Sequence, residues 1–228
     1  MQSGADAVYM GFGAYNARRS AKNFTEEEFA QAVRYCHLRG VKVYLTLNTL
    51  LTDRELPGAA ELLHKASRLG ADAVLIQDWG VWQLARQAAP ELPLHASTQM
   101  SLHTLGGARR AAELGLTRVV LARELSMDEI REIRRRTSPE LELETFCHGA
   151  MCVSYSGRCL LSNYMTGRDS NRGACAQPCR YQYALMEEKR PGEYFPVFED
   201  EKGTYIMNSR DMCMIDHLDD LMDAGVDC

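Results

Sequence analysis

The 228-residue sequence predicts an α/β fold, namely a TIM-like (β/α)8 barrel that is incomplete in this chain. Short apolar runs alternate with helical stretches, and successive runs start 21 to 36 residues apart. This spacing fits one strand–helix unit, and continuous apolar strands that alternate with helices indicate a parallel sheet. The turn into a strand is also repeated, as Gly-Ala-Asp-Ala-Val at residues 4–8 and again at 70–74. An open doubly wound sheet is the alternative, which is disfavoured because no Gly-x-Gly-x-x-Gly follows an expected strand.

Each element has its own sequence signal. The expected strands occupy residues 5–10, 41–47, 73–76, 94–96, 118–121 and 141–146. Three helices are expected to begin at capping boxes, in which a Ser or Thr and a Glu three residues later satisfy exposed backbone N–H groups. These pairs are Thr25 with Glu28, Thr52 with Glu55, and Ser126 with Glu129. Met1 stands only a few residues before the first expected strand, and Cys228 falls where the next strand should begin. We therefore expect this chain to be a fragment of a barrel that lacks a strand at each end.

The unit pattern stops after Phe146. We therefore expect one partial barrel domain over residues 1–228, with a Cys-rich insert at 147–183 that has no usable periodicity. A structureless loop longer than ~12–15 residues inside a compact domain is usually functional. In a barrel this loop leaves the carboxyl end of a strand, where active sites are built.

Composition excludes several classes of protein. The chain is 46% hydrophobic and 25% charged, with a formal net charge of −5, which is ordinary globular composition and not a wholly basic nucleic-acid coat. No apolar run reaches the ~18 residues of a membrane span. The first residues lack the basic and apolar regions of a secretory signal, so we expect a cytoplasmic protein. Charge is segregated, because residues 147–182 carry four arginines and one acid, whereas residues 191–228 carry ten acids and two bases.

Six of the eight cysteines fall between residues 147 and 213. In a reducing compartment such thiols are more often metal ligands or catalytic groups than disulfides. An iron–sulfur cluster needs four converging thiolates. Cys152 and Cys159 could approach one from the same loop, Cys175 or Cys179 could supply a third thiolate, and Cys213 could return from a later segment. A zinc site is a weaker alternative, because paired Cys-x2-Cys knuckles are absent, and structural or nucleophilic cysteines are another.

Polar residues follow the expected strands and should meet at the mouth of the barrel, where such groups tend to bind substrate. Gln77, Asp78 and Ser97 are among them, and helix capping or hydrogen bonding at the barrel rim is the alternative role. The catalytic candidates are Arg123, Glu144 and His148. The candidate substrate-binding residues are Arg18, Asn48, Gln99 and Arg158.

One long motif is specific. Residues 144–162 match the pattern Glu-x-Phe-x2-Gly-small-aliphatic-Cys-x4-Gly-x-Cys-x-aliphatic-Ser at every position. This stretch resembles the signature of the collagenase-like peptidase family U32, and the likeness extends over nearly the whole chain through residues 15–18, 46–49, 95–99 and 121–126. Residues 190–194, 198–200 and 205–209 are most similar to the tRNA hydroxylation branch of that family.

The resemblance implies more than the residues alone. The family is named for a protease, yet several members act in oxygen-independent hydroxylation of tRNA, ribosomal RNA or ubiquinone precursors. It implies prephenate as a co-substrate, whose two carboxylates would need arginines such as Arg18, Arg123 or Arg158. It also implies a 4Fe–4S cluster on Cys152, Cys159, Cys175 and Cys213, with Cys179 as a substitute for Cys175. The implied partner is tRNA or another RNA. We also expect that the protein could form a homo- or hetero-oligomer.

The arginines of the insert, together with Tyr155, Tyr164 and Tyr181, are the better candidates for RNA contact, because arginine binds phosphate and tyrosine stacks on unpaired bases. Proteolysis is the alternative function. A cysteine protease needs a thiolate beside a His, but Cys147 and His148 are adjacent and would point to opposite faces of a strand. No Gly-x-Ser-x-Gly or His-Glu-x-x-His is present. A non-catalytic iron–sulfur partner protein is the third alternative.

Overall fold

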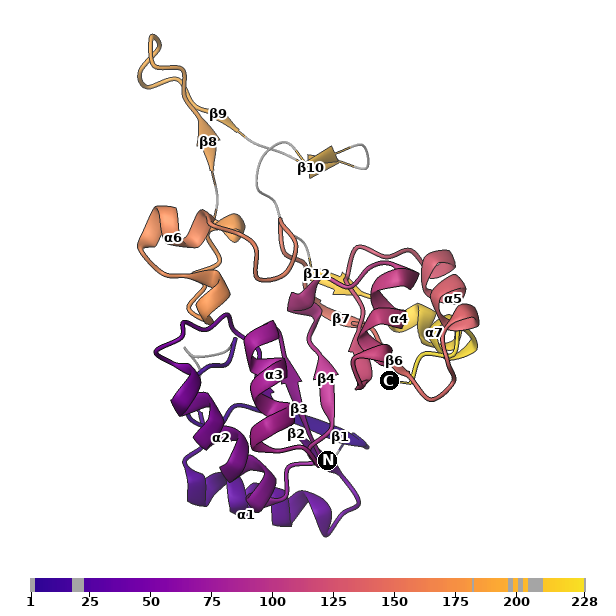
Figure 1. Ribbon diagram of the computed structural model, residues 1–228. Helices are drawn as coiled ribbons and strands as arrows, with labels where there is room; N and C mark the ends of the chain where they lie inside the picture. Colours follow the sequence, from indigo (N-terminus) through magenta and orange to yellow (C-terminus); the bar gives the residue numbers. More distant parts are fainter. Residues whose placement is uncertain are drawn as a thin grey trace.

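The computed structural model describes residues 3–17, 23–181, 183–196, 199–200, 203–204 and 211–227. Its centre is a six-stranded parallel sheet in which the strands follow one another in sequence order (Figure 1). The strands are β1 (Ala7–Met10), β2 (Lys42–Leu47), β3 (Ala73–Ile76), β4 (Leu94–Ala96), β5 (Leu116–Val120) and β6 (Glu142–Glu144). All six predicted strands are confirmed. A doubly wound sheet would reverse its strand order, so the unbroken order identifies a partial TIM-like barrel.

Five helices connect these strands and bury one face of the sheet. They are α1 (Glu26–His37), α2 (Leu56–Leu69), α3 (Trp79–Ala88), α4 (Leu105–Glu113) and α5 (Met127–Arg136). Alternate strand residues, such as Leu45 and Ile76, pack against helix residues such as Phe29 and Leu63, and all four are fully buried. Burying side chains of this size is the main favourable term in folding.

Two of the three expected capping boxes are confirmed. Thr25 caps α1 with Glu28, and Ser126 caps α5 with Glu129, and both reciprocal hydrogen bonds are present in each box. The third prediction was wrong, because α2 begins at Leu56. Glu55 therefore stands at the N-cap position, whereas a capping box needs it three residues after the N-cap. The Glu55 carboxylate does accept from the Thr52 N–H at 2.8 Å, but it also accepts from Arg172 at 3.1 Å. Glu55 therefore helps to tie the insert to the barrel.

The repeated strand-entry turn is confirmed by geometry. Val43 donates its N–H to the Asp72 carboxylate at 2.7 Å, and the Asp72 N–H donates to the Val43 carbonyl at 2.9 Å. Leu143 and Asp227 make the same two bonds at 2.6 and 2.8 Å. Asp72 stands at the turn from which the chain enters β3 beside β2. Asp227 makes the same bonds beside β6, so residues 225–227 have the conformation of a strand-entry turn.

The insert forms small elements beyond the sheet, whereas α7 (Leu218–Asp223), near the end of the chain, lies beside α5 (Figure 1). β7 (His148–Ala150) pairs antiparallel with β12 (Asp211–Cys213). The remaining short strands are β8 (Ala184–Leu185), β9 (Phe195–Pro196), β10 (Glu199–Asp200) and β11 (Gly203–Thr204), and the remaining helices are α6 (Leu161–Thr166), η2 (Ser170–Arg172), η3 (Pro178–Arg180), η4 (Ile215–His217) and α7 (Leu218–Asp223). Figure 1 shows the β8–β9 hairpin extending away from the sheet.

The helices of the described ranges are all too short or too polar to cross a lipid bilayer.

Candidate functional site

A cavity of about 470 Å³ lies between the carboxyl ends of the strands and the insert. Its walls come from both parts of the chain. The sheet contributes Tyr9, Thr46, Asn48, Ser97, Gln99, Arg123 and Glu144, and the insert contributes His148, Cys152, Cys159, Cys175 and Cys179. The size is typical of a small-molecule site, and the position is the one at which barrel enzymes bind their substrates.

Four thiols share this cavity. Burial is the main cause that raises the pKa of the Cys179 thiol above its ordinary value. Three neighbouring thiols raise it further, namely those of Cys175, Cys152 and Cys159. The sequence offered Cys179 only as a substitute ligand, whereas the structure groups it with the other three.

Three of the four sulfurs accept hydrogen bonds. The Leu161 N–H donates to Cys159 Sγ at 3.4 Å, and the Gln177 N–H donates to Cys175 Sγ at 3.3 Å. Arg123 Nη1 lies 3.7 Å from Cys152 Sγ. Hydrogen bonds to sulfur stabilise a thiolate and tune the potential of a cluster that it binds. The donor set therefore suits a soft metal centre.

Cys213, which the resemblance implies as the fourth ligand, does not itself line the cavity, although the neighbouring His148 does. Cys213 is on β12, directly opposite His148 of β7. Within the described ranges, no three His, Cys, Asp or Glu side chains stand close enough together to bind a single metal ion as they are. The four thiols that line the cavity are nevertheless of the ligand type that an iron–sulfur cluster requires.

Arg123 connects the barrel to the thiols. It follows β5, and its Nη1 donates to the Ala150 carbonyl at 2.8 Å. Its guanidinium carbon lies 4.0 Å from the centre of the Phe146 ring, which is a cation–π geometry. Its Nε is buried and has no acceptor among the described residues. Arg123 therefore keeps one donor for a ligand of the cavity.

Glu144 is held by two neighbours on the opposite face of the sheet from the helices. Arg118 Nη1 lies 3.2 Å from its carboxylate, and the Tyr9 hydroxyl donates to the same oxygen. The third catalytic candidate, His148, is exposed on β7 and also lines the cavity. The structure therefore brings Arg123, Glu144 and His148 to one site.

The predicted substrate-binding residues divide into three groups. Gln99 lines the cavity with a buried and unpartnered Oε1. Asn48 also lines it, but its amide accepts from the Ala17 N–H at 3.0 Å and donates to Ser97 Oγ at 3.3 Å, so it supports the rim. Arg158 is exposed outside the lining, and Arg18 lies outside the described residues.

Several residues of the site were not singled out from the sequence. Tyr9 and Arg118 point to the sheet face that the helices leave uncovered, with Tyr44 and His95 between them. A signal was present, because a charged Arg118 inside an apolar strand is unusual unless it is paired. Its partners, however, come from other strands and could not be named from the sequence.

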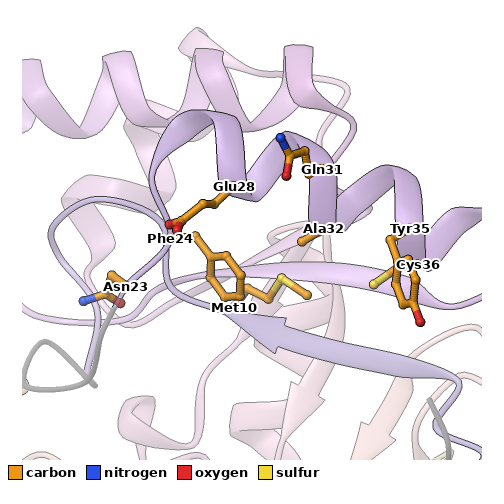
Figure 2. A pocket seen from close by; sticks show the side chains of 8 residues that line it. All are labelled: Met10, Asn23, Phe24, Glu28, Gln31, Ala32, Tyr35 and Cys36. Carbon is orange, nitrogen blue, oxygen red and sulfur yellow. The ribbon is translucent and has the colours of Figure 1, made fainter.

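A second hollow of about 470 Å³ lies under α1, on the other side of β1 (Figure 2). Figure 2 shows Phe24 and Met10 at its floor, with Tyr35 and Cys36 at one end. Its single carboxylate, Glu28, serves the capping box of α1, and burial raises the pKa of the Cys36 thiol. These side chains do not form a catalytic or ligand set, so the first cavity is the candidate site.

Several known proteins are similar to this chain over nearly its whole length. The chain is 42% identical over 224 residues to the "Uncharacterized protease MJ0090" of Methanocaldococcus jannaschii. This match covers 97% of the chain and 54% of that protein. It is 36% identical over 262 residues to the tRNA hydroxylation protein P of Escherichia coli, covering 98% of the chain and 58% of that protein. It is 40% identical over 223 residues to a 23S rRNA 5-hydroxycytidine synthase of Escherichia coli, covering 98% and 32%. The chain thus spans about half the length, or less, of these relatives.

The solved structure of the U32 peptidase Mk0906 superposes with a TM-score of 0.57 at 18% identity, covering 90% of this chain and 83% of that one. This likeness supports the fold alone. The profile of peptidase family U32 matches residues 1–228. The chain therefore belongs to peptidase family U32.

Proposed function

We propose that this chain carries the reaction site of a protein that hydroxylates a base of tRNA or another RNA without molecular oxygen. The observation that carries the proposal is the single cavity that joins four thiols to Arg123, Glu144 and His148 at the carboxyl ends of the strands. Relatives that match almost the whole chain are named as tRNA hydroxylation proteins and as an rRNA hydroxycytidine synthase. Such a protein would work in the cytoplasm, alone or in an oligomer.

A 4Fe–4S cluster is the cofactor that the thiols would hold. Cys152, Cys159 and Cys175 are the proposed ligands, because each accepts an N–H hydrogen bond at its sulfur. Cys179 is the fourth ligand that the described arrangement favours, and Cys213 is the alternative implied by the family resemblance. When bound, the cluster would supply one-electron chemistry beside the substrate.

The remaining residues of the cavity would bind and orient substrates. Arg123 offers its Nε to an anion such as a carboxylate of prephenate, the proposed co-substrate, while its Nη1 stays with Ala150. The Glu144 carboxylate is held at the wall of the cavity by Arg118 and Tyr9, which contact one of its oxygens, and can accept a hydrogen bond from a substrate. His148 is exposed at the rim, where its ring can hydrogen-bond to a substrate.

RNA would approach across the insert. Arg172 and Arg180 are neutralised by Glu55 and Asp211. Arg158 is exposed and makes no side-chain hydrogen bond or ion pair with another described residue, so it is the better phosphate contact. Tyr164 on α6 is 88% exposed, as suits a residue that stacks on an unpaired base.

Mass spectrometry of RNA tests the proposal. A strain that lacks the gene should lose a nucleoside carrying one added oxygen, and the full-length gene should restore it under anaerobic growth. The Cys152→Ala variant should fail to restore the mark, whereas Cys147→Ala, at an exposed thiol outside the cavity lining, should restore it. Unchanged RNA in the deletion strain would refute hydroxylation. Restoration only when a second protein is co-expressed would assign the chain to a non-catalytic partner.

One observation favours peptidase activity as the second candidate. Cys213 and His148 are opposite residues of an antiparallel pair, so their side chains leave the same face of the strands with Cβ atoms ~4.5–5.5 Å apart. A thiol beside a His is the minimum of a cysteine protease. Cleavage of denatured collagen that Cys213→Ser abolishes and Cys152→Ser leaves intact would favour this function, and absence of cleavage by the wild-type protein would remove it.

A further inference from the structure

Two short turns of the insert carry thiols in the same way. The Leu161 N–H donates to Cys159 Sγ at 3.4 Å, and the Gln177 N–H donates to Cys175 Sγ at 3.3 Å. In both turns the donor is the backbone amide two residues after the cysteine. A donor aimed at the sulfur stabilises the thiolate, which is the form that binds a metal.

Ser162 joins the two turns. It directly follows Leu161, it is 1% exposed, and it lines the cavity. Its Oγ accepts a hydrogen bond from the Ala176 N–H at 2.9 Å. Ala176 directly follows Cys175, so one buried hydroxyl connects the turn of Cys159 to the turn of Cys175.

The turn after Cys175 depends on such support. Gln177 has a φ of +57°, which lies in the left-handed region that is unfavourable for a residue with a side chain. A strained conformation of this kind persists only where the surrounding structure holds it. The Arg180 N–H donates to the Gln177 carbonyl at 3.0 Å on one side, and Ser162 holds Ala176 on the other.

Ser162 is itself held in place. It lies in the first turn of α6, and its carbonyl accepts from Thr166 Oγ1 at 2.7 Å, one helical turn later. Its hydroxyl therefore approaches the returning chain from a fixed element. A supporting residue on a fixed element can set the geometry of the groups that it contacts.

We propose that Ser162 is a positioning residue that sets the separation of the Cys159 and Cys175 sulfurs, so that both can bind one cluster. This inference rests on the proposed function, because the two thiols are among those that would hold the 4Fe–4S cluster. Ser162 acts through the backbone of Ala176 and is not a ligand. Residues that orient metal ligands in this way typically change metal affinity by about 10–100-fold when they are replaced.

Iron release from the full-length protein, purified anaerobically, tests the inference. The probe is an excess of a chelator that binds ferrous iron and is coloured when loaded. Ser162→Ala should release iron on the order of tenfold faster than the wild type. Ser138→Ala is the matched control and should release iron at the wild-type rate. Ser138 Oγ also accepts a backbone N–H, that of Glu140 at 3.2 Å, but it is exposed and lies outside the cavity lining.

A pair of variants of equal shape isolates the hydroxyl. Ser162→Thr keeps it, whereas Ser162→Val replaces it with a methyl group. The Thr variant should release iron at nearly the wild-type rate, and the Val variant should release it as fast as Ser162→Ala. Because both variants add the same bulk to a buried position, a difference between them reports the hydrogen bond and not the packing.

Amide hydrogen exchange, measured before the chelator is added, separates positioning from a general loss of stability. In Ser162→Ala the Ala176 amide should exchange on the order of fivefold faster than in the wild type, because its hydrogen bond is lost. The amide of Leu45, in the core of β2, should keep its wild-type rate.

Iron release at the wild-type rate from both Ser162→Ala and Ser162→Val overturns the inference, and so does equally fast release from the Thr and Val variants. A wild-type protein that binds no iron overturns it as well. The proposed function is judged separately by the hydroxyl mark in cellular RNA. A deletion strain that keeps this mark would refute hydroxylation, whereas faster iron release from Ser162→Ala and Ser162→Val would still support the positioning role.

Discussion

Arg118 Nη1 lies 3.2 Å from the carboxylate of Glu144, on the sheet face that the helices leave uncovered. The same guanidinium contacts Glu142 at 2.7 Å, and its side chain is only 7% exposed. Two carboxylates thus compensate one nearly buried cation, and the arrangement fixes Glu144 at the wall of the cavity. Arg118 is a positioning residue, because it reaches the site only through Glu144.

Replacing Arg118 should be costly. Arg118→Met leaves the Glu144 carboxylate, which is 13% exposed, without its cation. Removing one partner of a buried ion pair typically costs about 3–5 kcal/mol of unfolding free energy. Urea unfolding measures this loss, and Arg110→Met, which breaks an exposed pair with Glu113, is the control that should change stability by less than about 1 kcal/mol. Similar losses for both variants would contradict the structural role of Arg118.

Stability should fall as the pH drops below about 6.5 because of His95. Burial first, and then the charges of Arg118 and Lys42, lower the pKa of His95 from 6.5 to about 3. The folded state therefore keeps this ring neutral, whereas the unfolded chain binds a proton. Between these two pH values the unfolding free energy should decrease by about 1.4 kcal/mol per pH unit.

The His95→Gln variant checks this slope. Urea unfolding at several pH values should give a flatter profile for His95→Gln than for the wild type, and His64→Gln, at an exposed histidine on α2, should keep the wild-type profile. Below pH 4.5 a second loss is expected, because the hydrogen bond from Arg172 lowers the pKa of Glu55 to about 2. Parallel profiles for wild type and His95→Gln above pH 4.5 would show that His95 does not carry the effect.

The barrel could be predicted from the sequence because its signals are local. Apolar strands, capping pairs such as Thr25 with Glu28, and repeated entry turns each lie within a few residues of one another. The capping prediction at Thr52 failed because residues 53–55 form a turn and α2 begins only at Leu56, although Glu55 still accepts from the Thr52 N–H. The hydrogen bond between Glu55 and Arg172, which is 117 residues away, could not be predicted from a local pattern.

The sequence predicted which residues lie at the candidate site better than it predicted which residues they contact there. Strand-end position placed Arg123, Glu144 and Gln99 at the cavity correctly. It could not show that the Asn48 side chain is hydrogen-bonded to Ala17 and Ser97, nor that Cys179 lies near Cys175. The insert has no periodicity, so its internal contacts depend on tertiary packing that no short pattern encodes.

The cysteines should divide into two classes on anaerobic purification of the full-length protein. Alanine at Cys152, Cys159 or Cys175 should remove most of the iron, the acid-labile sulfide and the visible absorption. Alanine at Cys179 should do the same, because Cys179 lies among these thiols, whereas Cys147→Ala should retain the chromophore. Loss with Cys213→Ala and retention with Cys179→Ala would instead select the ligand on β12.

The salt dependence of RNA binding should identify the phosphate contacts of the insert. Each phosphate that a cation neutralises contributes about 0.7 to the slope of log affinity against log salt for single strands. Arg158→Ala should therefore weaken binding to oligouridylate and oligocytidylate alike and reduce the slope by about 0.7. Arg135→Ala is the control, because Arg135 is paired with Glu132 on α5. If the two variants give the same slope, then Arg158 does not contact phosphate, and the RNA path must cross another face of the insert.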